Sequence, residues 1–230
     1  MRNRILNWSV MNIVALGLCF TASVSMAGSP NVDASSKATD PKAASIEMIS
    51  LARTIISYGM KEKDSMALML GLKMLKTQSV KDNRAAASKD EKLSGQPYQE
   101  ALNNTQETLV KHARKFSSGD KTMLAIIDDV AAMSSRGAGG QIYVGEVAGG
   151  VVNEHVFDFN AGELAAVYVE GDGSVDLDLM VFDDNGNLIC ADTDNTDVGF
   201  CQWTPAHKGR FVLKIDNIGS QKNEYVLMTN

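Results

Sequence analysis

Aspartates near the end of the chain have the residue type and spacing that best fit a chemical role. Calcium takes about six to eight oxygen ligands from carboxylates and carbonyls, often in a flexible loop. The segment from Asp192 to Asp197 offers such oxygens at alternate positions, and an acidic hairpin before it offers more. The residues that this hypothesis assigns to calcium are Asp176, Asp178, Asp183, Asp192, Asp194 and Asp197.

The same aspartates have a second interpretation. Asp and Asn are frequent in turns because their side chains accept hydrogen bonds from nearby backbone N–H groups. The acidic loop also lacks the glycine and the distal glutamate of an EF-hand. Asp176 and Asp178 would then satisfy buried backbone amides at the edge of a sheet. The sequence leaves both interpretations open.

Familiar catalytic arrangements are not evident in the sequence. The three histidines, His112, His155 and His207, are not spaced as metal ligands. No Gly-x-Ser-x-Gly nucleophile elbow occurs. Asp128 and Asp129 are adjacent on a predicted helix, so their side chains point to different faces. We therefore expect a protein that is not an enzyme, with a carboxylate-based hydrolase as the less favoured alternative.

Residues 1–27 carry the three parts of a secretory signal peptide. Arg2 and Arg4 give a positive start, a short apolar run follows, and small residues lead to Ala27. The alternative is an N-terminal membrane anchor, but polar residues interrupt the apolar run and leave it short for crossing a bilayer. We expect cleavage after Ala27 and a periplasmic or secreted protein that meets the membrane only through its leader.

Cleavage leaves Cys190 and Cys201 as the cysteines of the mature chain. Two cysteines in an exported protein most often form a disulfide. Closing so short a loop stabilises the fold by roughly 3 kcal/mol in the chain-entropy model. Two buried thiols are the alternative, and a metal site would need more ligands than this pair and His207 provide. The sequence therefore predicts a disulfide.

The first half of the mature chain is predicted to be helical. Residues 28–44 are rich in Ser, Ala, Asp and Lys and are expected to form a disordered linker. Residues 45–136 contain four stretches with apolar residues at three- and four-residue spacing, which predicts helical hairpins or a small bundle. The expected helix boundaries are an end of the first helix at Tyr58-Gly59, an N-cap of the second at Asp64, a start of the third at Pro97 and an N-cap of the fourth at Asp120.

Residues 137–230 carry a different pattern, in which apolar and polar residues alternate after a glycine-rich boundary. Asn185-Gly186 between two apolar runs is a strong hairpin signal. The predicted strands are 141–147, 154–159, 164–170, 176–182, 187–191, 199–203, 210–216 and 224–229. Short strands at regular spacing predict a jelly-roll-like antiparallel β-sandwich of about eight strands. The expected fold class is therefore α+β, with a helical module followed by an all-β domain.

Four segments of this second half carry a family resemblance. They are Val156–Phe159 with Ala161–Leu164, Asp176–Leu179 with Val181–Asp183 and Gly186, Gly209–Ile215, and Tyr225–Leu227. Their order and spacing resemble the bacterial pre-peptidase C-terminal (PPC) domain, a small β-sandwich found beside secreted proteases. The resemblance implies an exported β-sandwich, and its members are linked to substrate binding, solubility or removal during maturation. The helical half carries no such resemblance.

Two departures limit what the resemblance implies. The Cys190–Cys201 pair is not part of the family's general pattern, and no peptidase domain precedes the sandwich in this sequence. The family's roles are therefore not assigned to particular residues here.

Two further features have both a binding and a packing interpretation. The helical half is rich in methionine, which suits either an adaptable peptide groove or a small, loosely packed core. Trp203 could join Phe200 and Phe211 in an aromatic binding face, or it could lie in the core beside the disulfide. We favour the core in both cases.

Charge is divided unevenly along the chain. Residues 28–136 carry 16 Lys/Arg and 13 Asp/Glu, a net charge of +3, whereas residues 137–230 carry 4 and 15, a net charge of −11. Nucleic acid is an unsuitable partner because its phosphates require a basic surface. We therefore expect a non-enzymatic accessory protein that binds a protein, peptide or polysaccharide, without a cofactor other than the hypothesised Ca²⁺. The alternative is an accessory subunit or inhibitor of a separately encoded hydrolase.

Overall fold

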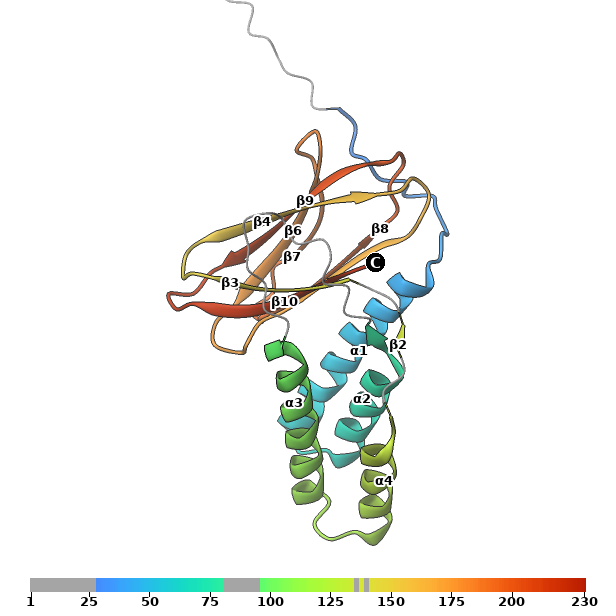
Figure 1. The fold of residues 1–230 in the computed structure, drawn as a ribbon, viewed down its shortest axis with the longest axis vertical. Coiled ribbons are helices and arrows are strands. Elements are labelled where there is room, and N and C mark those ends of the chain that lie inside the picture. The colour runs from blue at the N-terminus through green and yellow to red at the C-terminus, as the bar shows by residue number, and fades with distance from the viewer. Residues whose placement is uncertain (1–27, 81–95, 135–136, 139–140) are drawn as a thin grey trace, which may run out of the picture.

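The computed structural model describes residues 28–80, 96–134, 137–138 and 141–230, in which a helical module precedes a β-sandwich (Figure 1). The predicted signal peptide, residues 1–27, lies outside the described residues, as do residues 81–95 of the predicted helical module. Among the helices that are described, none combines the length and the apolar character needed to cross a membrane.

Aspartate caps define where three of the four helices begin. Asp40, Asp64 and Asp120 each accept hydrogen bonds from the backbone N–H groups two and three residues later. The predictions for Asp64 and Asp120 are confirmed, and Pro97 lies in the first turn of the third helix. The helices are α1 (Pro41–Glu62), α2 (Ser65–Thr77), α3 (Gln96–Phe116) and α4 (Lys121–Ala132).

The end of α1 was predicted wrongly. The helix continues through Gly59 to Glu62 and ends where Lys63 adopts a left-handed conformation, with φ of 56°. Gly59 serves helix packing instead of termination, because a Cβ atom there would lie 2.9 Å from the side chain of Leu68 in α2. A Cβ atom at Gly71 of α2 would lie even closer to α1, 2.5 Å from the side chain of Ile56, so glycines let the two helices approach each other.

Eight antiparallel strands form the predicted β-sandwich. They are β3 (Gln141–Val147), β4 (Val152–Phe159), β5 (Ala165–Glu170), β6 (Leu177–Asp183), β7 (Leu188–Asp192), β8 (Val198–Trp203), β9 (Gly209–Asn217) and β10 (Asn223–Thr229). One sheet has the order β3-β10-β5-β8 and the other β4-β9-β6-β7. A short parallel pair, β1 (Ser79–Val80) with β2 (Gly137–Ala138), connects the helical half to the point where the sandwich begins.

The predicted disulfide is formed and links the two sheets at one edge. Cys190 of β7 and Cys201 of β8 are joined, with their Cα atoms 5.9 Å apart. Asn185-Gly186 makes the predicted hairpin between β6 and β7, and Gly186 has a φ of 79° that favours glycine. The disulfide therefore fastens an edge strand of each sheet to the other.

The interior of the sandwich is built from alternate residues of both sheets. Its largest members include Phe211, Leu213, Ile215 and Tyr225. Trp203 is 5% exposed and packs against Phe159 and Phe211, which confirms that it belongs to the core.

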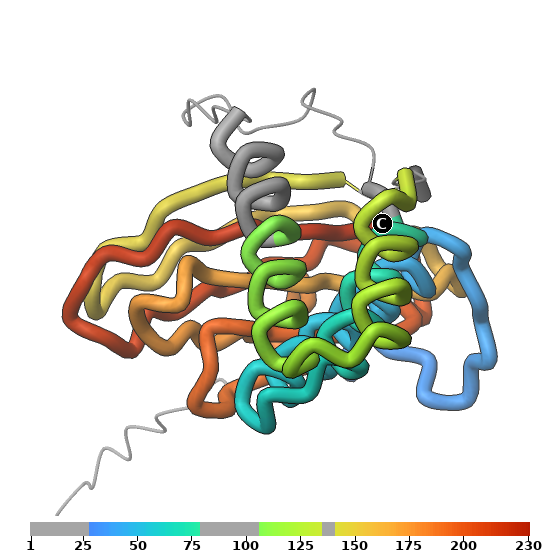
Figure 2. The backbone as a smooth tube through the Cα atoms, turned by 90° about the horizontal axis from the view of Figure 1, so that it is seen from below, coloured from blue at the N-terminus to red at the C-terminus, as the bar shows by residue number. Residues whose placement is uncertain are grey.

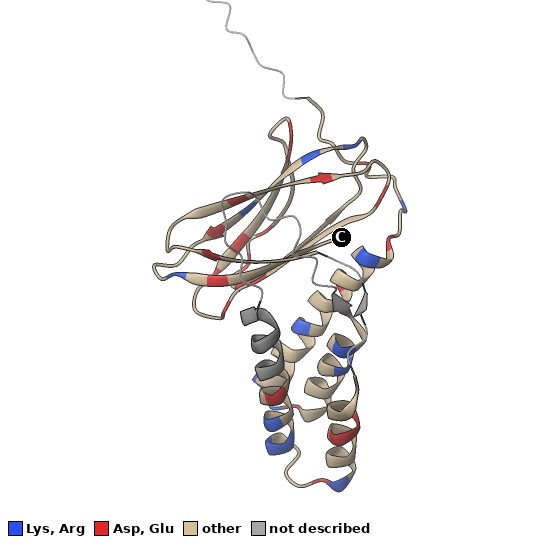
Figure 3. Ribbon diagram, in the orientation of Figure 1, with Lys and Arg blue, Asp and Glu red and all other residues tan. Residues whose placement is uncertain are grey.

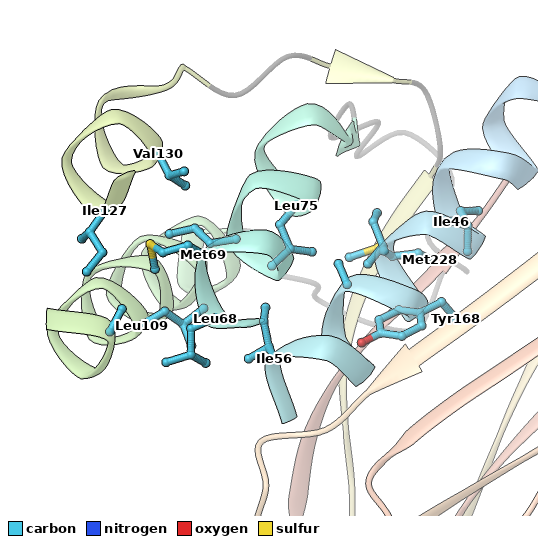
Figure 4. Close-up of a cluster of buried hydrophobic side chains, with 14 of the residues drawn as sticks. Ile46, Ile56, Leu68, Met69, Leu75, Leu109, Ile127, Val130, Tyr168 and Met228 are labelled. Carbon is cyan, nitrogen blue, oxygen red and sulfur yellow. The ribbon is translucent and has the colours of Figure 1, made fainter. Parts of the chain in front are cut away.

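The helical module packs on the outer face of only one sheet. Ala166 and Tyr168 of β5 and Met228 of β10 point out of the sandwich into the helical core, where they are fully or almost fully buried with Ile46 of α1 (Figure 4). Figure 2, which is seen from the side of the helices, shows them in front of part of the sandwich. We call this outer face of β3-β10-β5-β8 the covered face, and that of β4-β9-β6-β7 the open face.

An ion pair marks the boundary between the helices and the covered face. Arg53 Nε of α1 lies 3.1 Å from Glu170 Oε2 at the end of β5. The hydroxyl of Tyr168 donates a hydrogen bond to the same carboxylate at 3.0 Å. Burial raises the pKa of Glu170, and the nearby Arg53 and Tyr168 partly offset this effect.

The N-terminal segment differs from the predicted disordered linker. Asn31 is fully buried: its side chain accepts a hydrogen bond from the N–H of His207 at 2.9 Å and donates one to the carbonyl of the same residue at 3.0 Å. Val32 packs against the sandwich core, and the N–H of Asp33 bonds to the carbonyl of Thr204 at 2.8 Å. A polar composition did not prevent order here, because the end of the sandwich supplies partners for the backbone.

Candidate binding face

The structure brings several of the predicted calcium ligands together at one end of the open face. Asp178 lies on β6 and its register partner on β9 is Asp216, which is not among the predicted ligands. The pKa of Asp178 is raised, first by burial and then by the charges of nearby aspartates. These neighbours are Asp176, Asp216, Asp192 and Asp194.

Two predicted ligands lie elsewhere. Asp183, at the far end of β6, already accepts four hydrogen bonds, from the backbone N–H groups of Asn31, Asn185 and Asn187 and from the Asn187 side chain, at 2.8–2.9 Å. Despite its burial, these bonds hold the pKa of Asp183 below its usual range. Asp197 accepts a hydrogen bond from the N–H of Gly173 at 2.5 Å.

The clustered aspartates also accept hydrogen bonds from nearby backbone N–H and hydroxyl groups. Asp192 Oδ2 accepts from the N–H of Phe200 at 3.0 Å, and Asp194 Oδ1 accepts from the hydroxyl of Thr196 at 2.6 Å. The Oδ1 atom of Asp176 is buried without a hydrogen-bond partner. Among the described residues, no three His, Cys, Asp or Glu side chains are arranged to hold a metal ion. Calcium stays a prediction, to be tested by thermal melts with calcium and with chelator.

An apolar row crosses the middle of the open face. Val156 of β4 is opposite Val212 of β9, Val212 is opposite Phe182 of β6, and Phe182 is opposite Leu188 of β7. Val156 and Leu188, at the two ends, are 55% and 53% exposed. We call these four residues the apolar row. In the sequence each of these four residues is an ordinary outward-facing strand residue. Only the pairing register of the strands reveals that they are neighbours.

Charged residues flank the apolar row on both sides. Lys214 lies on one side, 2.8 Å from Glu154 and with its ammonium group 5.3 Å from the centre of the Phe182 ring. Asp158 and Arg210, opposite each other in register, lie on the other side. This part of the face is an open groove of about 820 Å³, lined by Glu154, Asp158, Phe182, Asp183, Asp184, Gly186, Arg210, Val212 and Lys214.

The electrostatic character of the open face is acidic. Its outward-facing acidic residues include Glu154, Asp158, Asp178 and Asp216, and Asp184 lies at the rim of the groove. The basic residues on the same face are Arg210 and Lys214. Figure 3 shows the wider division, with Asp and Glu spread over the sandwich and many of the Lys and Arg residues on the helices. The face can therefore offer apolar contact together with acceptors for cationic groups.

Other residues considered in the sequence have structural partners. His155 Nε2 lies 2.7 Å from the hydroxyl of Tyr225, and the ring of His112 stacks at a tilt near Phe116. Among the described methionines, Met69, Met123 and Met228 are buried in the helical core, whereas Met66 is exposed.

Comparisons with known proteins give matches to solved structures only. No protein-family model matches the chain, and no curated protein matches it. Matched structures include the pre-peptidase C-terminal domain of a collagenase from Bacillus anthracis, with 14% identity and a TM-score of 0.32, covering 39% of this chain and 87% of that one. This structure is described as a domain of the family that the sequence resembles.

Two further matched structures have other descriptions. PliG from Aeromonas hydrophila, a periplasmic inhibitor of g-type lysozyme, has 14% identity and a TM-score of 0.32, covering 40% of this chain and 84% of that one. The Yersinia pseudotuberculosis-derived mitogen has 16% identity and a TM-score of 0.30, with the same coverage. No function is transferred from similarities of this size, and the fold rests on the strand pairing described above.

Proposed function

We propose that this chain is a non-enzymatic binding protein of the periplasm or extracellular space, and that the open face receives a protein, peptide or polysaccharide partner. The observation that carries the proposal is the apolar row. Val156 and Leu188 are more than half exposed, although Tyr168 and Met228 on the outer side of the other sheet are buried under helices. Exposed apolar residues that form a continuous patch with a polar rim are typical of interaction sites.

The shape of the site favours binding over catalysis. Small-molecule sites of enzymes are usually enclosed cavities with a few polar groups aimed inward. The groove on this face is open, and its charged residues lie at the rim of an apolar strip. Glu154 and Lys214 also pair with each other. Such a surface suits an extended contact with a large partner.

The disulfide supports the proposed location. Disulfides persist in oxidising compartments and are rare in the cytosol. The Cys190–Cys201 bond links the two sheets of this sandwich, so the fold benefits from an oxidising environment.

Site-specific photo-crosslinking tests the proposal. A photo-reactive amino acid at Val156 should give a covalent adduct in the native extracytoplasmic fraction, and Val212→Asp in the same chain should abolish it. The matched control carries the photo-reactive residue at Ile218, which is 55% exposed but lies beyond the end of β9, six residues from Val212 and off the apolar row. Equal adducts at both positions, or none at Val156, would contradict the proposal.

The identity of the crosslinked partner and an activity assay on the purified mature chain separate the alternatives. A hydrolase as the crosslinked partner would indicate an accessory subunit or inhibitor. Hydrolysis of an ester, peptide or glycan substrate by the purified mature chain would instead show that the protein is an enzyme. We expect no turnover with any of these substrates.

A further inference from the structure

A second apolar surface is exposed on the α1–α2 hairpin. Leu51 and Tyr58 of α1 are 49% and 56% exposed, and Met66 and Leu70 of α2 are 52% and 49% exposed. Leu51 and Tyr58 are seven residues apart and Met66 and Leu70 four apart, so each pair lies along one side of its helix. We call these four residues the hairpin stripe.

The hairpin stripe faces away from the sandwich. The opposite side of α1 carries Ile46 and Arg53, which meet the covered face. Ile55 of α1 and Met74 of α2 are half-buried and lie between the stripe and the contact of the two helices. The two halves of the stripe are therefore adjacent and form one apolar surface.

The charge around the hairpin stripe is opposite to that of the open face. Residues 41–78 contain six Lys/Arg and three Asp/Glu, but Arg53 pairs with the sandwich and Lys76 is buried against backbone carbonyls. Lys61, Lys63 and Lys73 are exposed near the stripe, with Glu47 and Glu62 among them, which leaves an excess of one positive charge. The open face combines its apolar row with an excess of carboxylates, so the two surfaces match in both apolar character and charge.

We propose that the hairpin stripe of one copy of this protein occupies the open face of another copy. The inference rests on the proposed function, because it names the partner of the same face. The hairpin lysines of one copy lie beside the acidic residues of the next, and Tyr58 and Leu51 pack on the apolar row.

The dimensions of the two surfaces agree. Leu51 and Tyr58 are about 10 Å apart along a helix that rises 1.5 Å per residue. The apolar row crosses four strands, which is about 14 Å at the usual strand spacing. The chain already contains a packing of this kind, since α1 lies on the covered face with Arg53 paired to Glu170 at its edge. The proposed contact repeats a helix-on-sheet arrangement on the other sheet.

The contact joins two different surfaces and is therefore heterologous. A pair of copies keeps one unused hairpin stripe and one unused open face, so further copies add head to tail unless the assembly closes into a ring. This property allows a complementation test that an interface between identical surfaces would fail.

The test uses sedimentation velocity on the mature chain from Gly28 and on two variants, Tyr58→Asp in the hairpin stripe and Val212→Asp in the apolar row. The wild-type chain should form species larger than the monomer as concentration rises, and less so at high salt. Each variant alone should be monomeric, with association weakened at least about tenfold. An equimolar mixture should form a heterodimer and nothing larger, because only one pair of intact surfaces remains.

Control variants separate loss of the interface from loss of the fold. Ile218→Asp places the same charge off the hairpin stripe and off the apolar row, and it should associate like the wild type. Thermal melts accompany every variant, and Val156→Asp and Leu70→Ser replace the two main variants if either melts early. These substitutions alter side chains that are already about half exposed.

Three outcomes would overturn the inference. The first is a wild-type chain that stays monomeric, and the second is a variant mixture that does not associate. The third is normal self-association of Val212→Asp, which would indicate hairpin-to-hairpin pairing. The proposed function would survive any of these results if the Val156 crosslink still joined a different protein, whereas absence of any adduct would remove both.

Discussion

The two sheets of the sandwich share one interior but differ on their outer faces. On the covered face, Tyr168 and Met228 are continuous with the helical core. On the open face, the corresponding layer mixes the apolar row with ion pairs and aspartates. A sheet face that is to be covered permanently excludes water with apolar side chains, whereas a face that exchanges partners must also be stable in water. The difference indicates that the helices complete the fold, and it supports the proposal that the open face makes an external contact.

The largest expected change in stability comes from placing a charge on the covered face, and the same charge on the open face is its control. Met228→Asp should destabilise the protein by about 3–5 kcal/mol, because it buries an unpaired carboxylate between helices and sheet. Val156→Asp should change the unfolding free energy by no more than about 0.5 kcal/mol, because its side chain is more than half exposed. Chemical denaturation of both variants checks the difference, and equal destabilisation would end the distinction between the faces.

Removal of the disulfide should weaken the edge at which the two sheets are joined. The bond closes a loop with a sequence separation of 11, which corresponds to roughly 3 kcal/mol in the chain-entropy model. Replacing both Cys190 and Cys201 with Ser should therefore lower the denaturation midpoint strongly. Reduction of the wild-type chain is the matched control, and a midpoint that neither change moves would show that the edge is held by packing alone.

Loss of the Asp183 carboxylate should cost about 2–4 kcal/mol, since four N–H donors lose their acceptor. The neighbouring Asp184→Ala, at the rim of the groove, is the control and should be almost neutral. Because the folded-state pKa of Asp183 is lowered, its contribution is present above the ordinary carboxylate pKa and is lost as pH falls through the folded-state value. Urea melts at neutral and acidic pH test this: Asp183→Ala should differ from the wild type less at low pH.

The smallest expected effect concerns the acidic end of the open face. The folded-state pKa of Asp178 is raised, so its contribution to stability is present at low pH and is lost as pH rises through that value. Asp178→Asn should therefore stabilise the protein at neutral pH by less than about 1 kcal/mol, and the gain should disappear near pH 4. Asp158→Asn on the same face serves as the control, and a gain that does not depend on pH would argue against charge repulsion as its cause.

Much of the fold could be predicted from local patterns. All eight predicted sandwich strands agree with the structure to within two residues at each end, because alternation and turn residues are local signals. The helix caps at Asp64 and Asp120 were found for the same reason. Gly59 was misread, since its role depends on Leu68 of another helix and not on its own neighbours.

The candidate site was only partly predictable. The sequence marked the acidic residues but could not show that Asp216 joins them or that Asp183 belongs to a hairpin and to the N-terminal segment. The apolar row depends on the register of four strands that are not consecutive in the chain. Long-range register is not contained in the spacing along any single strand.

The burial of Asn31 also bears on the order in which the protein folds. Its N–H group bonds to Asp183, which lies 152 positions further along the chain. A polypeptide made from its N-terminus onward must therefore leave this segment without its partners until almost the entire sandwich has been synthesised. We expect this contact to form late in folding, so that docking of the N-terminal segment on the sandwich marks a nearly complete fold.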